Sequence, residues 1–249
     1  MRDGLKLGGI SVDAANRARP FIEDIIALNG NRIHSLHIIG SAATDEYVPE
    51  ASDVNTLLVL SKMDFEMLDA IASLGRKYAR KHLKSPLLMT PDYIRNSLDV
   101  FPVEFLNISL IHKTVYGDDV FSSVRVSNAD LRLQCERDIK AKLVGLRQGY
   151  ISSMGDAKFL AEGFASSFAG YIQLFRGILQ LHGKTPPVAS REVLSVLQES
   201  AGADVAAFVF VLEHRHTKKT PSDQELKNAF MGYYRTIELL GDLVDSIVL

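Results

Sequence analysis

The chain has 249 residues and is 47% hydrophobic, which is enough for one large domain or two small ones, each with its own core. Its 28 basic and 30 acidic side chains leave a net charge of −2, so nothing in the charge predicts a nucleic acid or an anionic membrane as a partner. With one cysteine, Cys135, no apolar signal-peptide core and no run of about 20 apolar residues, the sequence predicts a cytoplasmic protein without internal disulfides or membrane spans.

The first half of the chain alternates strand and helix signals. One helical segment begins with Pro20, which the first turn of a helix tolerates, and ends at Asn29-Gly30. Runs rich in β-branched and apolar residues indicate strands. In chain order, we expect helices at residues 20–30, 64–83 and 91–98, and strands at 33–40, 53–60, 85–90 and 101–117. Strands separated by helices of this length predict an α/β domain with a mixed sheet.

The second half of the chain has helical periodicity throughout, starting at Asn128. Its segments at 128–151, 156–183, 190–200, 204–216 and 221–249 favour an antiparallel helical bundle. The sequence therefore predicts an α/β (α+β) mixed-sheet domain at 1–125, followed by an all-α bundle domain at 126–249. The apolar ending at 243–249 can pack on this bundle or on a second subunit, which leaves a homo-oligomer open.

Three glycines recur every seven residues in the expected helix at 156–183, namely Gly163, Gly170 and Gly177. They line up along one side of the helix, and each costs about 1 kcal/mol relative to alanine. We expect the close approach of another helix to compensate. The alternative is a backbone surface that is exposed to a ligand.

A motif that can carry chemistry lies between the first two expected strands. Gly40-Ser41 ends an apolar run, and Asp53 and Asn55 open the next strand after a spacer. Gly40 lets the strand turn sharply and lets a phosphate approach the backbone, and a helix that opens at Ser41 can bind an anion through its N–H groups. Positions 53 and 55 point to the same side of a strand, so Asp53 and Asn55 can share one cation.

This order of residues resembles the signature of the nucleotidyltransferase superfamily, most closely its small bacterial and aminoglycoside-adenylyltransferase-like branches. The resemblance covers residues 20–120. It implies that Gly40 and Ser41 bind a nucleoside triphosphate, and that Asp53 and residue 55 hold the magnesium ion (Mg²⁺) that accompanies it. The family takes a third carboxylate from a later strand. Glu104, in the expected apolar strand at 101–117, corresponds to it as a metal ligand or as the catalytic base toward an acceptor hydroxyl.

One position departs from the family pattern, because Asn55 stands where the family has Asp or Glu. An amide oxygen can bind Mg²⁺, but it brings no negative charge. With Asp53 and Glu104, the site would hold two negative charges instead of three. One metal ion carried in with the nucleotide stays feasible, whereas two-metal chemistry is disfavoured.

Some other polar residues are weaker candidates. Arg137 and Lys140 lie three apart in the expected helix at 128–151, where they either bind phosphates in a cleft or form a solvated helix face. His34 and His37 flank the first strand, where either could reach the cleft, but the sequence favours a surface position for both.

The sequence leaves three functions open. The first is a nucleotidyltransferase that moves a nucleoside monophosphate to a hydroxyl of a small molecule or a protein. The second is a nucleotide-binding or regulatory protein that kept the fold and lost catalysis. The third is an interaction module of the kind found in toxin–antitoxin pairs, where small nucleotidyltransferase domains occur.

Overall fold

The computed structural model describes residues 4–78, 82–217 and 219–248. The chain divides into two compact units. The first comprises Met1–Leu98 and Ile108–Arg125, and the second comprises Asp99–Asn107 and Val126–Leu249. The chain passes from the first unit to the second for the last time after Arg125, next to the expected boundary at residue 125. The short segment Asp99–Asn107, which the sequence assigned to the sheet domain, belongs to the helical unit.

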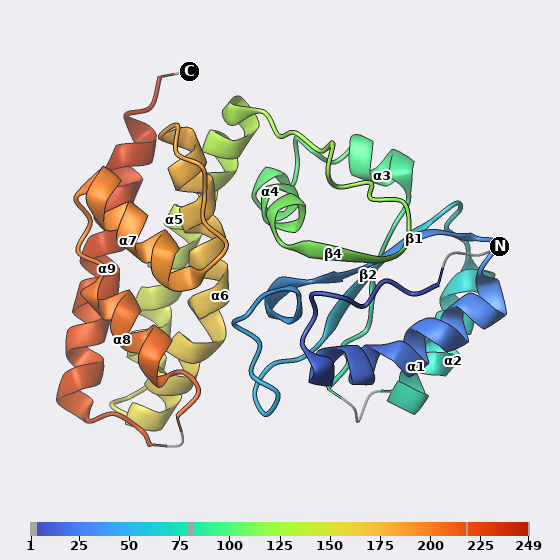
Figure 1. Cartoon of the computed structure of the whole chain (residues 1–249). Helices are drawn as coiled ribbons and strands as arrows, with labels where there is room; N and C mark the ends of the chain where they lie inside the picture. The colour runs from blue at the N-terminus through green and yellow to red at the C-terminus, as the bar shows by residue number, and fades with distance from the viewer. Residues whose placement is uncertain (1–3, 79–81, 218, 249) are drawn as a thin grey trace. The chain divides into compact units, whose positions relative to one another are not determined.

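The first unit is built on a four-stranded mixed sheet in the order β3-β2-β1-β4. Strand β1 pairs antiparallel with β2 on one side and with β4 on the other, and β3 joins β2 in parallel. The bounds are Ile33–Ile39 for β1, Asn55–Leu60 for β2, Leu87–Met89 for β3 and His112–Gly117 for β4. The predicted mixed sheet is therefore confirmed, with the strands visible in Figure 1.

Helices α1 (Val12–Asn29) and α2 (Phe65–Tyr78) cover one face of this sheet. Helix α1 begins eight residues before Pro20, because Ser11 caps it by accepting the amide of Ala14 at 3.1 Å. The predicted continuation of α2 over residues 79–81 lies outside the described residues. The core between these helices and the sheet is made of fully buried apolar side chains, among them Phe21, Ile22, Ile25, Leu36, Ile38, Leu58 and Leu60.

The single strand expected at 101–117 is wrong. The segment forms helix α4 (Pro102–Leu110) and then β4, with α3 (Pro91–Arg95) before it. The run is apolar almost throughout, so its periodicity did not separate a helix from a strand. The signals for a helix were Pro102 at the first turn and Glu104 near the positive end of the helix dipole. Glu104 is therefore a helical residue.

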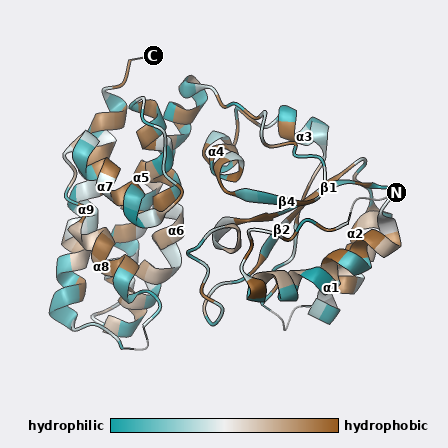
Figure 2. Cartoon of the chain, in the orientation of Figure 1, coloured by the Kyte–Doolittle hydropathy of each residue, from teal (hydrophilic) through white to brown (hydrophobic). Residues whose placement is uncertain are grey.

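The second unit is helical, as the sequence predicted. Besides the first part of α4, it contains α5 (Asn128–Ser152), α6 (Ala157–Leu181), α7 (Ser190–Ala201), α8 (Ala206–His214) and α9 (Asp223–Asp245). Figure 2 shows hydrophobic and hydrophilic residues alternating around these helices, as expected where one face of each helix is buried. Across the described residues, no helix is both long enough and apolar enough to span a membrane.

Candidate functional site

The Gly40-Ser41 turn directly follows β1. Gly40 has a φ of +71°, in the left-handed region that favours glycine, and opens the 3-10 helix η1 (Gly40–Ala43). Thr44 closes the turn, because its backbone amide and its hydroxyl both donate to the carbonyl of Ser41 at 2.9 Å. The predicted helix at Ser41 is thus a single 3-10 turn that begins one residue earlier.

Asn55 lies beside this turn. A Cβ built on Gly40 would be 3.6 Å from Nδ2 of Asn55, so the amide group is in contact range of the turn. In the sheet, Asn55 is the partner of Ile39, the last residue before Gly40. The structure therefore brings together three of the residues that the motif singled out, Gly40, Ser41 and Asn55.

Asp53 precedes β2 and lies two residues before Asn55. Val54 between them is fully buried in the core under α1 and α2, and alternation then directs positions 53 and 55 to the opposite face. The carboxylate of Asp53 lies 3.2 Å from the ammonium nitrogen of Lys84 and 3.6 Å from Nδ1 of His82. A cation that binds Asp53 must therefore compete with Lys84.

Glu104 lies in the second unit, near the start of α4. Its Oε2 accepts a hydrogen bond of 2.8 Å from Nε2 of Gln134, and the side-chain oxygen of Gln134 accepts the amide of Val103 at 2.9 Å. The same Nε2 also donates to Asp138 at 3.3 Å. Burial raises the pKa of Asp138, and the charge of Glu104 raises it further. Gln134 thus holds a pair of interacting carboxylates that the sequence did not reveal.

Arg137 and Lys140 are both exposed on α5 of the second unit. Arg137 lies 3.7 Å from Asp138, and Lys140 forms ion pairs with Glu136 and, at 3.7 Å, with Asp245. Each cation has an acidic neighbour within its own unit, which is the arrangement of a solvated helix face.

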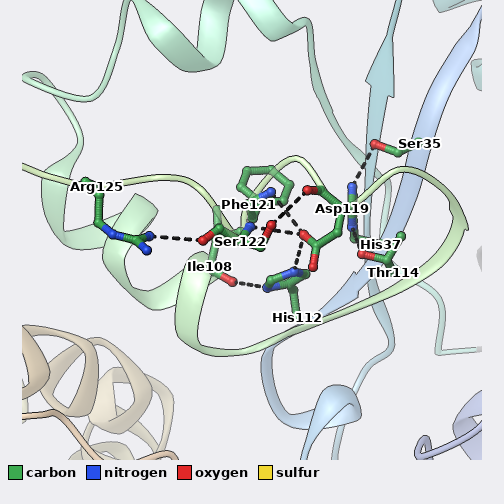
Figure 3. A network of polar contacts seen from close by, with 9 residues as sticks. All are labelled: Ser35, His37, Ile108, His112, Thr114, Asp119, Phe121, Ser122 and Arg125. Carbon is green, nitrogen blue, oxygen red and sulfur yellow. Dashed lines mark hydrogen bonds and ion pairs between the residues drawn. The ribbon is translucent and has the colours of Figure 1, made fainter.

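Figure 3 shows a polar network around His37, His112 and Asp119 that the sequence did not predict. Ile39 pairs with Asn55 on one side and with His112 of β4 on the other, so Asn55 and His112 lie two strands apart, about 10 Å at the usual strand spacing. Nε2 of His112 lies 2.8 Å from Asp119, and Nδ1 lies 2.8 Å from the carbonyl oxygen of Ile108. Both partners are hydrogen-bond acceptors, so each ring nitrogen of His112 faces a group to which it can donate.

The partner of His112, Asp119, is held as a carboxylate. Burial acts to raise its pKa, but the hydrogen bond and charge of His112, with the amides of Ser122 and Phe121, lower the pKa overall. These two amides donate to Oδ1 at 3.1 Å. The pair is therefore a charge-assisted hydrogen bond with a fixed geometry.

His37 stands next to this pair and is fully buried, which corrects the expectation that it lies at the surface. Its ring nitrogens lie 2.8 Å from the hydroxyl of Ser35 and 3.0 Å from that of Thr114. Burial, and then the positive charge of His112, lower the pKa of His37 to about 4. His37 is consequently neutral at pH 7, and the ring of Phe121 packs edge-on against it at 5.0 Å between centroids.

The ligand atoms of His37, His112 and Asp119 lie within 4.8 Å of one another, which is close enough for one metal ion. However, His112 and Asp119 already satisfy each other, and both nitrogens of His37 have hydroxyl partners. We interpret the cluster as a hydrogen-bonded network. The sequence signals for it were a histidine in the middle of a strand and the Gly117-Asp118-Asp119 turn after β4, but they gave no spacing typical of a site.

Comparison with known proteins defines the fold. No family model matches the chain, and no curated protein matches it. Among solved structures, it is similar to the spectinomycin adenyltransferase AAD(9) from Enterococcus faecialis, whose crystal structure contains ATP and spectinomycin. The TM-score is 0.54 at 11% sequence identity, and the similarity covers 95% of this chain and 100% of that chain. The chain thus has a nucleotidyltransferase-like fold, a mixed sheet domain with a helical region after it.

Proposed function

We propose that this protein binds a nucleoside triphosphate with Mg²⁺ beside Gly40-Ser41 and transfers the nucleoside monophosphate to a hydroxyl of a small molecule or a protein. The observation that carries the proposal is the similarity of fold, over 95% of the chain, to an adenyltransferase crystallised with ATP and a small molecule. The contact range between Gly40 and Asn55 supports it, because it sets the side-chain amide of Asn55, through its Nδ2, beside a turn that a phosphate can approach.

The donor set fits one Mg²⁺ that arrives with the nucleotide. Asp53 supplies a carboxylate and Asn55 an amide oxygen, and Mg²⁺ prefers oxygen ligands with few protein carboxylates and with phosphates completing its shell. When bound, the ion would neutralise charge on the triphosphate. In this proposal Gly40 and Ser41 face the phosphates. The carboxylate of Asp53 gives up its ion pair with Lys84 and binds the cation instead.

In the transfer itself, the acceptor oxygen attacks the α-phosphorus, the bond from phosphorus to the α–β bridging oxygen breaks, and pyrophosphate leaves. The hydroxyl proton needs a base, and we propose Glu104. Its carboxylate is exposed and accepts a hydrogen bond from Gln134, which orients it. Glu104 as a third metal ligand, and Arg137 and Lys140 as phosphate contacts, remain separate predictions.

A second function, nucleotide binding without transfer, has its own support. Asn55 lowers the negative charge of the motif, and Asp53 is paired with Lys84. Both features weaken the hold on a metal ion, and metal charge is what accelerates phosphoryl transfer most. Such a protein would sense a nucleotide instead of consuming it.

Two measurements separate these functions. Millimolar ATP or GTP with Mg²⁺ should raise the melting temperature, because a ligand that binds only the folded state stabilises it. Asp53→Ala should remove the shift, whereas Asp69→Ala, at an exposed carboxylate on α2, should keep it. Pyrophosphate release with a panel of hydroxyl acceptors then reports transfer, and Glu104→Gln should abolish that release without changing the melting shift.

The outcomes are distinct. A melting shift without pyrophosphate release from any acceptor supports the nucleotide-binding function. An unchanged melting curve with both nucleotides contradicts both functions and favours the interaction module. Retention of the shift in Asp53→Ala would show that the nucleotide binds elsewhere.

A further inference from the structure

A pocket of about 410 Å³ lies within the second unit, between α5, α6 and α9. This volume is in the usual range for a small-molecule site. Its walls combine three features, namely glycine backbone, aromatic rings and one ammonium group. The residues that carry these features are Gly145, Gly149, Gly163, Tyr150, Phe164, Tyr171, Phe230 and Lys142.

The glycines of the pocket do not serve helix packing. A Cβ built on Gly145, Gly149 or Gly163 would meet nothing within 4 Å, so each opens onto space. Gly177, later on α6, is the opposite case, because its Cβ would lie 2.9 Å from the sulfur of Cys135. The close approach expected for the glycine repeat thus holds at Gly177 and not at Gly163, where glycine leaves the backbone exposed at a cost of about 1 kcal/mol relative to alanine.

Aromatic rings supply the apolar part of the pocket. Tyr150 of α5 stacks on Phe230 of α9, with centroids 4.3 Å apart and planes inclined by 29°. Phe164 and Tyr171 of α6 are buried behind the opening, and Phe159 is half exposed beside it. Flat faces of this kind favour a flat apolar ligand, because offset stacking adds to the burial of apolar area.

Lys142 gives the pocket its charge, and it is the one charged residue among the described residues that line it. Its ammonium lies 4.2 Å from the centroid of the Tyr171 ring and would lie 3.2 Å from a Cβ on Gly170, so the absence of a side chain there makes room for it. Burial lowers the pKa of Lys142, and Asp138 partly opposes this. An anion in the pocket would replace some of the hydration that the ammonium has lost.

We propose that this pocket is a binding site for a small molecule with a flat apolar body and a single negative charge, held by Lys142. A triphosphate does not fit this description, since one ammonium that already interacts with Asp138 cannot balance about four negative charges. The site is therefore separate from the nucleotide site proposed beside Gly40, and it does not depend on that proposal.

Two fluorescent probes test the proposal, 8-anilinonaphthalene-1-sulfonate and N-phenyl-1-naphthylamine, which share both ring systems and differ in the sulfonate. Titration should show one sulfonate-probe site per chain. Lys142→Met should weaken the sulfonate probe about tenfold and the neutral probe less than twofold, because only the former meets the charge. Lys142→Arg should restore most of the affinity. Gly149→Leu should abolish the binding of both probes by filling the pocket.

Matched controls are Lys227→Met, at an exposed lysine on α9, and Gly75→Leu, at a glycine of α2 with similar open space. Neither should change either affinity. Leucine favours helix over glycine, so Gly149→Leu should fold, which its melting curve checks. Equal binding of the sulfonate probe to Lys142→Met and to the wild type would overturn the proposal, as would unchanged binding to Gly149→Leu. Displacement of the probe by ATP with Mg²⁺ would overturn its separation from the nucleotide site.

Discussion

The two faces of the sheet in the first unit differ sharply, although neighbouring residues of the same strands build both. Leu36, Ile38 and Leu58 point to the face covered by α1 and α2, where the described side chains are almost all apolar. His37 and Asn55, between them in sequence, point to the other face, with His112 across the sheet. Because side chains alternate with a period of two, one face can hold the fold while the other carries polar chemistry.

The largest effect should come from the covered face. Leu58→Ala should lower the free energy of unfolding by about 3 kcal/mol, because it leaves a cavity at a fully buried position. Asn55→Ala, three residues away on the other face, should lower it by less than about 1 kcal/mol. Urea denaturation of both variants measures the contrast. Equal losses would mean that both faces contribute alike to the core.

The next effect concerns pH and the polar face. The pKa of His37 is lowered from 6.5 to about 4 in the folded protein, so between these values the unfolded chain binds more protons. Stability should therefore fall as pH drops from 6.5 toward 4, by about 3 kcal/mol from this residue. The charged and titratable groups acting on it are His112, Asp119 and His34.

Substitution isolates this contribution. His37→Gln keeps a hydrogen-bonding side chain but cannot titrate, so its unfolding free energy should depend less on pH in that range than that of the wild type. The matched control is His34→Gln, at an exposed histidine on the same strand, which should change the pH dependence less than His37→Gln does, because His34 is the smallest of the causes that act on His37. Parallel curves for His37→Gln and the wild type would show that His37 already titrates normally in the folded protein.

A smaller effect, a gain of stability, is expected at Thr56, a polar residue on the otherwise apolar covered face. Thr56 pairs with Ile38 in the sheet, and its buried hydroxyl has no hydrogen-bond partner. Thr56→Val keeps the shape and removes the unsatisfied group, so stability should rise by about 1 kcal/mol. Thermal unfolding measures it, with Thr114→Val as the contrast, because that hydroxyl is bonded to His37. A loss of stability in Thr56→Val would mean that the hydroxyl is satisfied.

The sequence predicted the strands at β1 and β2 and the helical second region because these segments have clear periodicity. The sequence did not predict helix α4, because its apolar run has no helical or strand periodicity and Pro102 was not recognised as a helix start. It also missed the pair His112–Asp119 and the pocket around Lys142. Both depend on which strand or helix lies next to which, and a single sequence does not carry that register.

The central claim is that the face carrying Asp53 and Asn55 binds a metal ion with a nucleotide. The most direct test is calorimetric titration of Mg²⁺ with a non-hydrolysable triphosphate into the wild type, Asn55→Asp and Asp53→Ala. Asn55→Asp is nearly isosteric and adds a negative charge beside the ion, so it should tighten Mg²⁺ binding about tenfold, equal to about 1.4 kcal/mol, and Asp53→Ala should abolish it. Identical binding in all three proteins would contradict the claim, because neither side chain would then face the metal ion.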